Sequence, residues 1–278
     1  MTKAVGIDIN EIKALYFELD LPVPYKLSSD QKIEICPISV ANSPLFLASL
    51  EILKINKNTI PSPQVISMSY LQFLTMVVFP KNKIGLAKLV NIMRLSLGWN
   101  DWTIKIGEQA KPYIYNNENG YIISPKQFDD IRKIILYQNL YMYDDTYIAP
   151  ELEKAIQEEE ELRNKNIDIP SLERRIAIIT AHTGISKQEQ KEMTLRSHQL
   201  LFDEVVGETE FVTVRPISLY AGKEIDHWIY RKRRGRFDKY ITSVEDYNKS
   251  MGGTGQVQSV TADNELSVQQ IINNFQKQ

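Results

Sequence analysis

The stretch IMRLSLGWNDWTIKIG, Ile92 to Gly107, contains the point at which the chain changes from one hydrophobic period to another. Before Gly98 the apolar residues recur every three or four positions, which predicts a helix from about Asn82 to Leu97. After it, the segment WTIKIG alternates in twos, which predicts a strand. Glycine readily adopts the left-handed conformation that ends helices, so Gly98 is the expected end of this helix.

The segment that follows continues the two-residue period. KPYIYNNENGYIIS, residues 111–124, alternates around the tetrad Asn117 to Gly120, whose Asn-Gly step favours a tight hairpin turn. Ser124 and Pro125 then provide a cap and a first turn for a helix that runs to about Tyr141. Residues 82–141 are therefore expected to form a compact α+β unit of helix, hairpin and helix.

The part before residue 82 is expected to contain strands and then helices. Strands are predicted over 12–27 and 31–40, where apolar residues alternate between proline and Ser-Ser-Asp breaks. A helix is predicted over 43–55 with Ser43 as its cap, and another over 67–79 with Ser67 as its cap and Pro80 at its end.

The part after residue 146 is predicted to be mostly helical. Pro150 opens a helix that carries Glu158 to Glu161, and the caps of three later helices are Ser171, Ser186 and Thr194. Pro216 is expected to bend or end the last of these. The fold class is α+β: a small N-terminal α+β part with a β-hairpin, then a mostly α-helical C-terminal domain and a flexible tail. The predicted divisions are an N-terminal α+β domain (1–146), a charged linker helix (147–168), a helical domain (169–248) and a flexible tail (249–278).

The bulk composition is that of an ordinary globular chain. Of 278 residues 43% are hydrophobic and 24% are charged, and the formal net charge is −2, so the molecule as a whole is not built to bind a polyanion. The longest apolar stretch, YLQFLTMVVF, is far shorter than the roughly 20 residues that cross a bilayer. We expect no signal peptide and no contact with a membrane.

The sequence offers few groups arranged for chemistry. The three histidines, His182, His198 and His227, have no paired spacing, and the adjacent carboxylates Asp129-Asp130 and Asp144-Asp145 do not converge on one point. The glycines after Met251 lack the lysine and hydroxyl residue of a phosphate loop. We therefore expect no enzyme, and no catalytic, cofactor-binding or metal-binding residues; no cofactor is expected.

One segment, HWIYRKRRGRFDKY from His227 to Tyr240, is dense in cations. Between Ala221 and Tyr240 seven cations meet three acids, so this segment carries +4 and the rest of the chain about −6. Three interpretations stay open: charge-matched contact with acidic protein surface such as Glu158 to Glu161, solvated surface, or nucleic-acid binding. The candidate partner-binding residues are Trp228, Tyr230, Arg231, Lys232, Arg233, Arg234, Arg236 and Phe237.

Three segments carry a resemblance to a known family. They are PSPQVISMSYLQFL (61–74), DDTYIAPELEKAIQEEEEL (144–162) and TGISKQEQKEMTLRSHQLLFDEV (183–205). Together they resemble tail assembly chaperones, or closely linked morphogenesis proteins, of tailed phages and prophages of Gram-positive bacteria. The similarity runs from about residue 30 to 230.

The resemblance implies a non-enzymatic role. Such chaperones escort the long tape-measure protein while the tail tube polymerises around it, act in the host cytoplasm, and leave before the virion is complete. The implied partners are the tape-measure and tail-tube proteins, with possible self-association and no expected role for nucleic acid. Two alternatives stay open: a structural virion protein of the neck, tail or baseplate, and a nucleic-acid-binding protein that uses the basic run 231–236.

Overall fold

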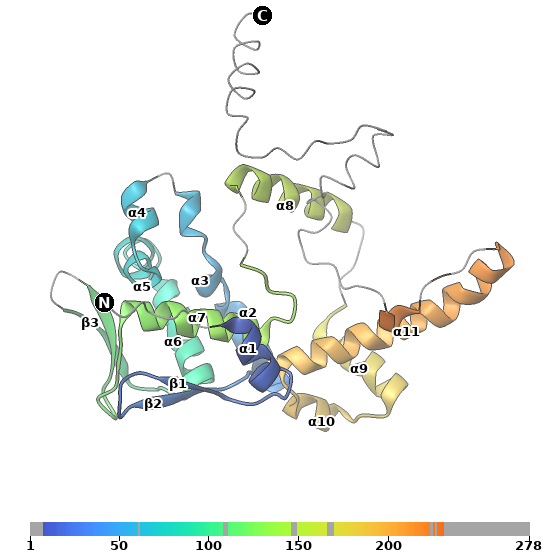
Figure 1. The fold of residues 1–278 in the computed structure, drawn as a ribbon, viewed down its shortest axis with the longest axis horizontal. Helices are drawn as coiled ribbons and strands as arrows, with labels where there is room; N and C mark the ends of the chain where they lie inside the picture. The colour runs from blue at the N-terminus through green and yellow to red at the C-terminus, as the bar shows by residue number, and fades with distance from the viewer. Residues whose placement is uncertain are drawn as a thin grey trace, which may run out of the picture. The chain divides into compact units, whose positions relative to one another are not determined.

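The structure is a computed structural model that describes residues 8–60, 62–107, 111–145, 149–165, 170–222, 225 and 227–230 (Figure 1). All of these residues belong to one unit, Met1–Lys232. Residues 231–278 lie outside the described residues, so the predictions made for the basic run 231–236 and for the tail 249–278 stay predictions.

The chain begins with a helical segment where the sequence predicted a strand. Helix α1 (Ile9–Ile12) continues into the π-helical turn η1 (Lys13–Phe17). The Asp8 carboxylate caps this helix and accepts hydrogen bonds of 2.9 and 3.4 Å from the N–H groups of Asn10 and Glu11, the second and third helical residues. The predicted strand over 12–27 was therefore wrong up to residue 22, since the observed strand begins at Val23. The side chains that pack against the core, Ile9, Ile12 and Tyr16, have helical spacing. This spacing and the Asp8 cap outweigh the two-residue alternation of apolar residues that predicted a strand.

A two-stranded antiparallel hairpin follows. Strands β1 (Val23–Lys26) and β2 (Lys32–Ile35) pair with Val23 opposite Ile35 and Lys26 opposite Lys32. Val23, Ile33 and Ile35 are buried, so one face of this hairpin covers the core while the other carries the charged side chains.

Short helices connect this hairpin to a longer helix. They are η2 (Val40–Asn42), α2 (Ser43–Ser49), α3 (Glu51–Lys54), η3 (Lys57–Thr59), α4 (Pro63–Ser67), α5 (Tyr70–Phe73) and the π-helical turn η4 (Leu74–Val78). Two predicted caps were wrong. Ser43 lies within α2, and Ser69 rather than Ser67 caps α5, because only Ser69 has a glutamine three residues later to complete a capping box.

The segment that decided the predicted fold has the expected structure. Helix α6 (Lys83–Leu97) ends at Gly98, whose φ of 70° is left-handed. Strands β3 (Trp102–Ile106), β4 (Pro112–Asn116) and β5 (Ile122–Ile123) then form an antiparallel sheet in the order β3-β4-β5. Gly120, with φ 73°, lies in the turn between β4 and β5. The Asn-Gly turn therefore joins β4 to β5, as the sequence predicted.

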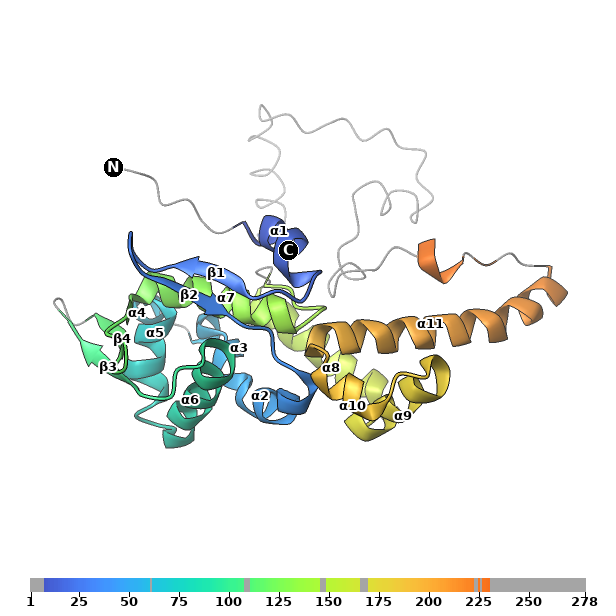
Figure 2. The same cartoon turned by 90° about the horizontal axis from the view of Figure 1, so that it is seen from below.

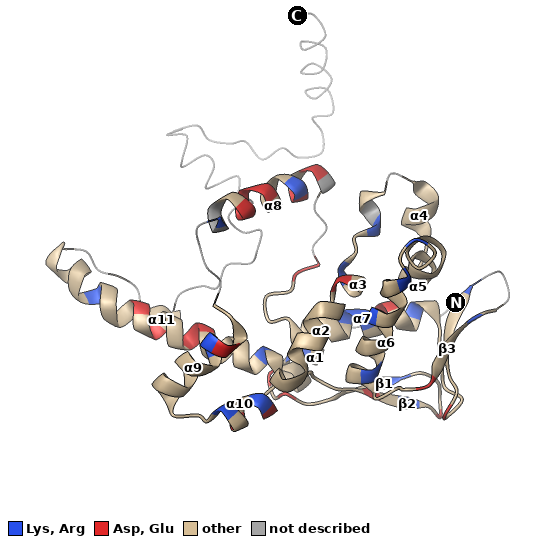
Figure 3. Cartoon of the chain, turned by 180° about the vertical axis from the view of Figure 1, so that it is seen from behind, with Lys and Arg blue, Asp and Glu red and all other residues tan. Residues whose placement is uncertain are grey.

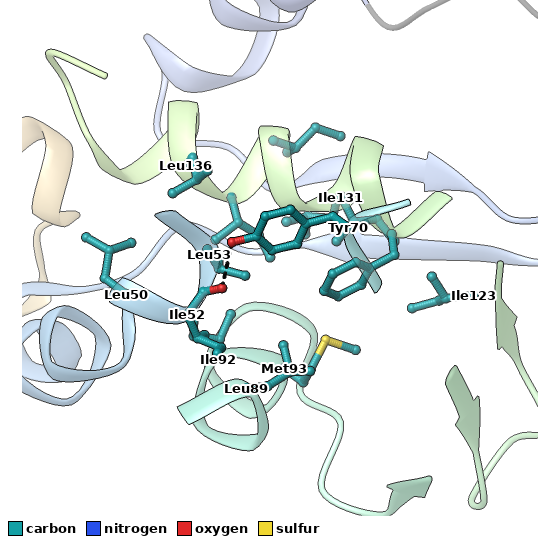
Figure 4. Close-up of a cluster of buried hydrophobic side chains, with 14 of the residues drawn as sticks. Leu50, Ile52, Leu53, Tyr70, Leu89, Ile92, Met93, Ile123, Ile131 and Leu136 are labelled. Atoms are coloured by element: carbon teal, nitrogen blue, oxygen red, sulfur yellow. Dashed lines mark hydrogen bonds between the residues drawn. The ribbon is translucent and has the colours of Figure 1, made fainter. Parts of the chain in front are cut away.

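Helix α7 (Pro125–Asn139) lies at the centre of the core. The predicted Ser124 cap is confirmed, with Gln127 completing the capping box. Buried α7 side chains include Phe128, Ile131, Ile134, Ile135 and Leu136. Figure 4 shows Tyr70 of α5 within the same cluster, where its hydroxyl donates a hydrogen bond of 2.9 Å to the Ile52 carbonyl.

The C-terminal part of the described chain is helical. Its elements are α8 (Pro150–Asn164), α9 (Leu172–Thr183), α10 (Lys187–Glu192), α11 (Leu195–Tyr220) and the 3-10 turn η6 (Trp228–Tyr230). The caps Ser171, Ser186 and Thr194 are confirmed. Helix α11 continues through Pro216 to Tyr220, so this proline does not end the helix.

Backbone hydrogen bonds join the start of α11 to the segment after β2. The Val40 N–H donates to the Met193 carbonyl at 2.9 Å, and the Leu195 N–H donates to the Ile38 carbonyl at 2.7 Å. The Asn139 side chain at the end of α7 accepts from the Ile38 N–H at 2.7 Å. Figure 2 shows α11 starting beside that end of α7.

The fold class is therefore α+β, with two small antiparallel sheets among the described residues and a helical C-terminal part. The charged helix α8 lies within the predicted linker range 147–168. The domain boundaries themselves stay predictions.

Candidate functional site

Two of the eight candidate partner-binding residues lie in the described part of the chain. These are Trp228 and Tyr230, both in η6. The other six, Arg231, Lys232, Arg233, Arg234, Arg236 and Phe237, lie outside the described residues. The site is therefore built from the segment that directly precedes the basic run.

Trp228 is fixed against the middle of α11. Its indole Nε1 donates a hydrogen bond of 3.2 Å to the Glu204 carboxylate, and its ring centre lies 5.4 Å from that of Phe211. Between these two α11 residues stands Gly207, where a Cβ atom would lie 3.1 Å from the indole Cδ1. The glycine thus leaves room for the indole ring to lie close to the helix.

His227 completes this contact. Its ring stacks on Trp228 with centres 4.0 Å apart and lies 4.5 Å from Phe211. The backbone N–H of Ile229 donates to His227 Nδ1 at 3.4 Å. We call Phe211, His227 and Trp228 the aromatic dock.

The residues that follow the aromatic dock are not packed in the same way. Ile229 is 63% exposed and Tyr230 is 82% exposed. Arg231, the first residue of the basic run, follows Tyr230 directly in the sequence. An exposed aliphatic and an exposed aromatic side chain thus precede five cations, a combination typical of protein-contact surfaces.

Acidic side chains are concentrated on two helices of the C-terminal part. Figure 3 shows them on α8 and in the middle of α11, where they are Asp203, Glu204, Glu208 and Glu210. On α8, Glu158 is 3.8 Å from Lys154 in an ion pair. Pairing between the basic run and Glu158 to Glu161 stays a prediction, because the run lies outside the described residues.

A second surface, which the sequence did not single out, lies where α11 extends past α9. A hollow of about 380 Å³ is lined by Ile178, Val205, Val206, Thr209, Glu210, Thr213 and Val214. The signal in the sequence was FVTVRPISLY, Phe211 to Tyr220, ten residues with a single charge. Its helical period was obscured because apolar side chains occur on every face.

The adjacent carboxylates Asp129 and Asp130 bind different partners within the fold and do not converge on one point. Asp129 accepts from the Tyr70 N–H at 3.0 Å, whereas Asp130 accepts from the Tyr25 hydroxyl at 2.9 Å. Asp145 accepts from the Tyr137 hydroxyl and lies 2.8 Å from Lys133. Burial raises the pKa of the Asp145 carboxyl, but hydrogen bonds from Lys133 and Tyr137 outweigh it, so the net pKa lies below its usual value.

The histidines occupy three different environments. His182 Nε2 lies 3.3 Å from the Thr209 hydroxyl, His227 belongs to the aromatic dock, and His198 is buried beside Gln190. Burial, followed by the charge of Arg175, lowers the pKa of His198. Its neutral ring therefore fits a packed interior position on α11.

Among the described residues, no helix has both the length and the apolar composition needed to cross a membrane. A scan against protein-family models, a search of curated proteins and a search of solved structures each find no match to this chain.

Proposed function

We propose that this chain is a non-enzymatic protein-binding factor, a tail assembly chaperone that binds the tape-measure protein while the tail tube forms. The observation that supports this proposal is the aromatic dock. It holds Trp228 of η6 against α11, and the next two residues, Ile229 and Tyr230, are exposed and directly precede the basic run in the sequence. Large exposed side chains beside cations suit the binding of a protein partner with apolar and acidic surface.

The client in this proposal is the one that the family resemblance implies, and the binding surface consists of the residues that follow the aromatic dock. In this proposal Ile229 and Tyr230 provide the apolar contact, and Arg231, Arg233 and Arg234 provide the charge match. The host cytoplasm is the proposed place of action.

Co-expression with a tape-measure protein and a tail-tube protein, followed by pull-down, tests the proposal. We expect a complex with the wild-type chain and a weaker one after Ile229→Ser with Tyr230→Ser, or after Arg231, Arg233 and Arg234 are replaced by Ser. The matched control is Ile106→Ser on β3, because Ile106 is 73% exposed and lies on a different element. Failure of the wild-type chain to form any complex contradicts the proposal.

Two further measurements separate the alternatives. A chaperone should be absent when purified particles are analysed by mass spectrometry, whereas a neck, tail or baseplate protein should be present. Binding to DNA that weakens steeply with salt would instead favour the nucleic-acid alternative, because each phosphate contact adds to the salt dependence.

A further inference from the structure

The last part of α11 is apolar and exposed. Helix α9 ends at Thr183, and the contact between His182 and Thr209 marks the level on α11 where α9 stops. Beyond that level the exposed fractions are 62% for Val212, 44% for Val214, 65% for Ile217, 60% for Leu219 and 95% for Tyr220. Figure 3 shows this end of α11 with almost no charged residues. A helix that is apolar on all sides is normally covered by another element.

One face of α11 has the spacing of a coiled-coil seam. Its residues follow one another at alternating steps of three and four positions: Asp203, Val206, Glu210, Thr213, Ile217 and Tyr220. We call these six residues the α11 seam. Three of them, Val206, Glu210 and Thr213, also line the hollow beside α9. The seam spans about 26 Å at the rise of an α-helix. It has the 3-4 spacing of a coiled coil, with apolar or aromatic side chains at Val206, Ile217 and Tyr220 and polar ones at the other three positions.

The α11 seam is complementary to itself when two copies run antiparallel. A twofold axis between Phe211 and Val212 places Ile217 of each copy opposite Val206 of the other. Ile217 then enters the hollow beside α9, where Ile178 and Val205 add apolar contacts. The exposed Ile217 and most of the residues that line the hollow thus belong to the same helix, α11.

One polar layer of this arrangement matches as well. The same axis places Asp203 opposite Tyr220, whose hydroxyl can donate to the carboxylate, and Glu210 opposite Thr213, whose hydroxyl already donates to the Thr209 carbonyl at 2.7 Å. Within the fold this chain already makes such pairs, between Tyr25 and Asp130 and between Tyr137 and Asp145. A parallel pair would instead set Glu210 against Glu210, which is unfavourable.

From this self-complementarity we propose that the occupant of the hollow and of the α11 seam is a second copy of this chain, in an antiparallel twofold dimer. The inference does not rest on the proposed function, because the seam and the aromatic dock lie on different faces of α11. A basic amphipathic helix from another protein is the competing occupant.

The full-length chain is tested by size-exclusion chromatography with light scattering over a range of concentrations. We expect a mass that approaches twice 32.1 kDa. Ile217→Glu should weaken the dimer at least tenfold, because it places a carboxylate against Val206. The matched control is Leu219→Glu, which adds the same charge at a similarly exposed position outside the seam and should leave the dimer intact.

Cysteine cross-linking then tests whether the two α11 helices of the dimer run antiparallel. With Cys36 replaced by Ala, Glu210→Cys and Thr213→Cys copies are mixed and oxidised. The antiparallel dimer should link position 210 of one copy to position 213 of the other. A monomer at all concentrations, equal effects of Ile217→Glu and Leu219→Glu, or links from 210 to 210 would each overturn the proposal.

Discussion

The Asp20 carboxylate accepts a hydrogen bond of 2.6 Å from the Thr194 hydroxyl, although 174 residues separate the two in the sequence. Its second oxygen accepts one of 2.7 Å from the Ser197 hydroxyl. Asp20 therefore places a negative charge at the N-terminus of α11, where the helix dipole favours it. Its φ of 56° is left-handed, which aspartate tolerates better than most residues.

Replacement of Asp20 by glycine or alanine should separate the contribution of the carboxylate from that of the left-handed backbone. Asp20→Gly removes the carboxylate but fits the backbone, so we expect it to lower the free energy of unfolding by about 2 kcal/mol. Asp20→Ala also removes the carboxylate but keeps a Cβ at the left-handed φ, so it should cost roughly 1 kcal/mol more than Asp20→Gly. Urea unfolding measures both. Equal losses for the two variants would contradict a strained backbone at this position.

The buried histidine should make stability depend on pH. Because the pKa of His198 lies below its usual value of 6.5 in the folded chain, the unfolded chain binds more protons as the pH falls. The stability that His198 contributes is therefore complete above about pH 6.5 and is lost as the pH falls through the folded pKa. Unfolding measured from pH 7.5 to 5 should show this loss.

The control for that prediction is His198→Gln. The Gln190 amide nitrogen donates to the Ile176 and Ile185 carbonyls and to the Thr180 hydroxyl, so its oxygen faces His198. A glutamine at position 198 can donate to the same oxygen without titrating. We expect the variant to lose less stability between pH 7 and 5 than the wild type, and an unchanged loss would refute the assignment.

The hydroxyl of Tyr70 should contribute to the stability of the core. It is buried and donates to the Ile52 carbonyl, and burial, opposed in part by Arg132, raises the pKa of Tyr70 to about 12. Tyr70→Phe keeps the ring under the Arg132 guanidinium but leaves the carbonyl without this donor. We expect a loss of about 1 kcal/mol in urea unfolding. An unchanged midpoint would mean that another donor satisfies the carbonyl.

The parts of this fold that could be predicted from the sequence depend on local signals. The Gly98 stop, the Asn-Gly turn and the Ser124 and Thr194 caps each involve residues within a few positions of one another. The bridge between Ser39 and Thr194 could not be predicted, because its partners are far apart in the sequence and Thr194 is a helix cap rather than part of an alternating segment. The aromatic dock could not be predicted for a similar reason, since Phe211 lies on α11 whereas His227 and Trp228 lie beyond the end of that helix.

The aromatic dock should protect the backbone that follows it. Trp228→Ala removes both the hydrogen bond to Glu204 and the ring contacts with Phe211 and His227. We expect faster hydrogen exchange at the amides of Ile229 and Tyr230, with exchange in α7 unchanged, because the loss is local. Tyr230→Ala is the matched control and should have a smaller effect, since that side chain is 82% exposed and its ring contacts only His227 of the dock, with centres 6.0 Å apart.

The closeness of Gly207 to Trp228 should make their substitutions non-additive. Alanine within a helix is more stable than glycine by about 1 kcal/mol, but a Cβ at position 207 would lie 3.1 Å from the indole Cδ1. Gly207→Ala should therefore stabilise the chain by the full amount only when Trp228 is already alanine. A double-mutant cycle in urea measures this coupling. If Gly207→Ala stabilises both backgrounds equally, the indole ring does not lie against the glycine in solution.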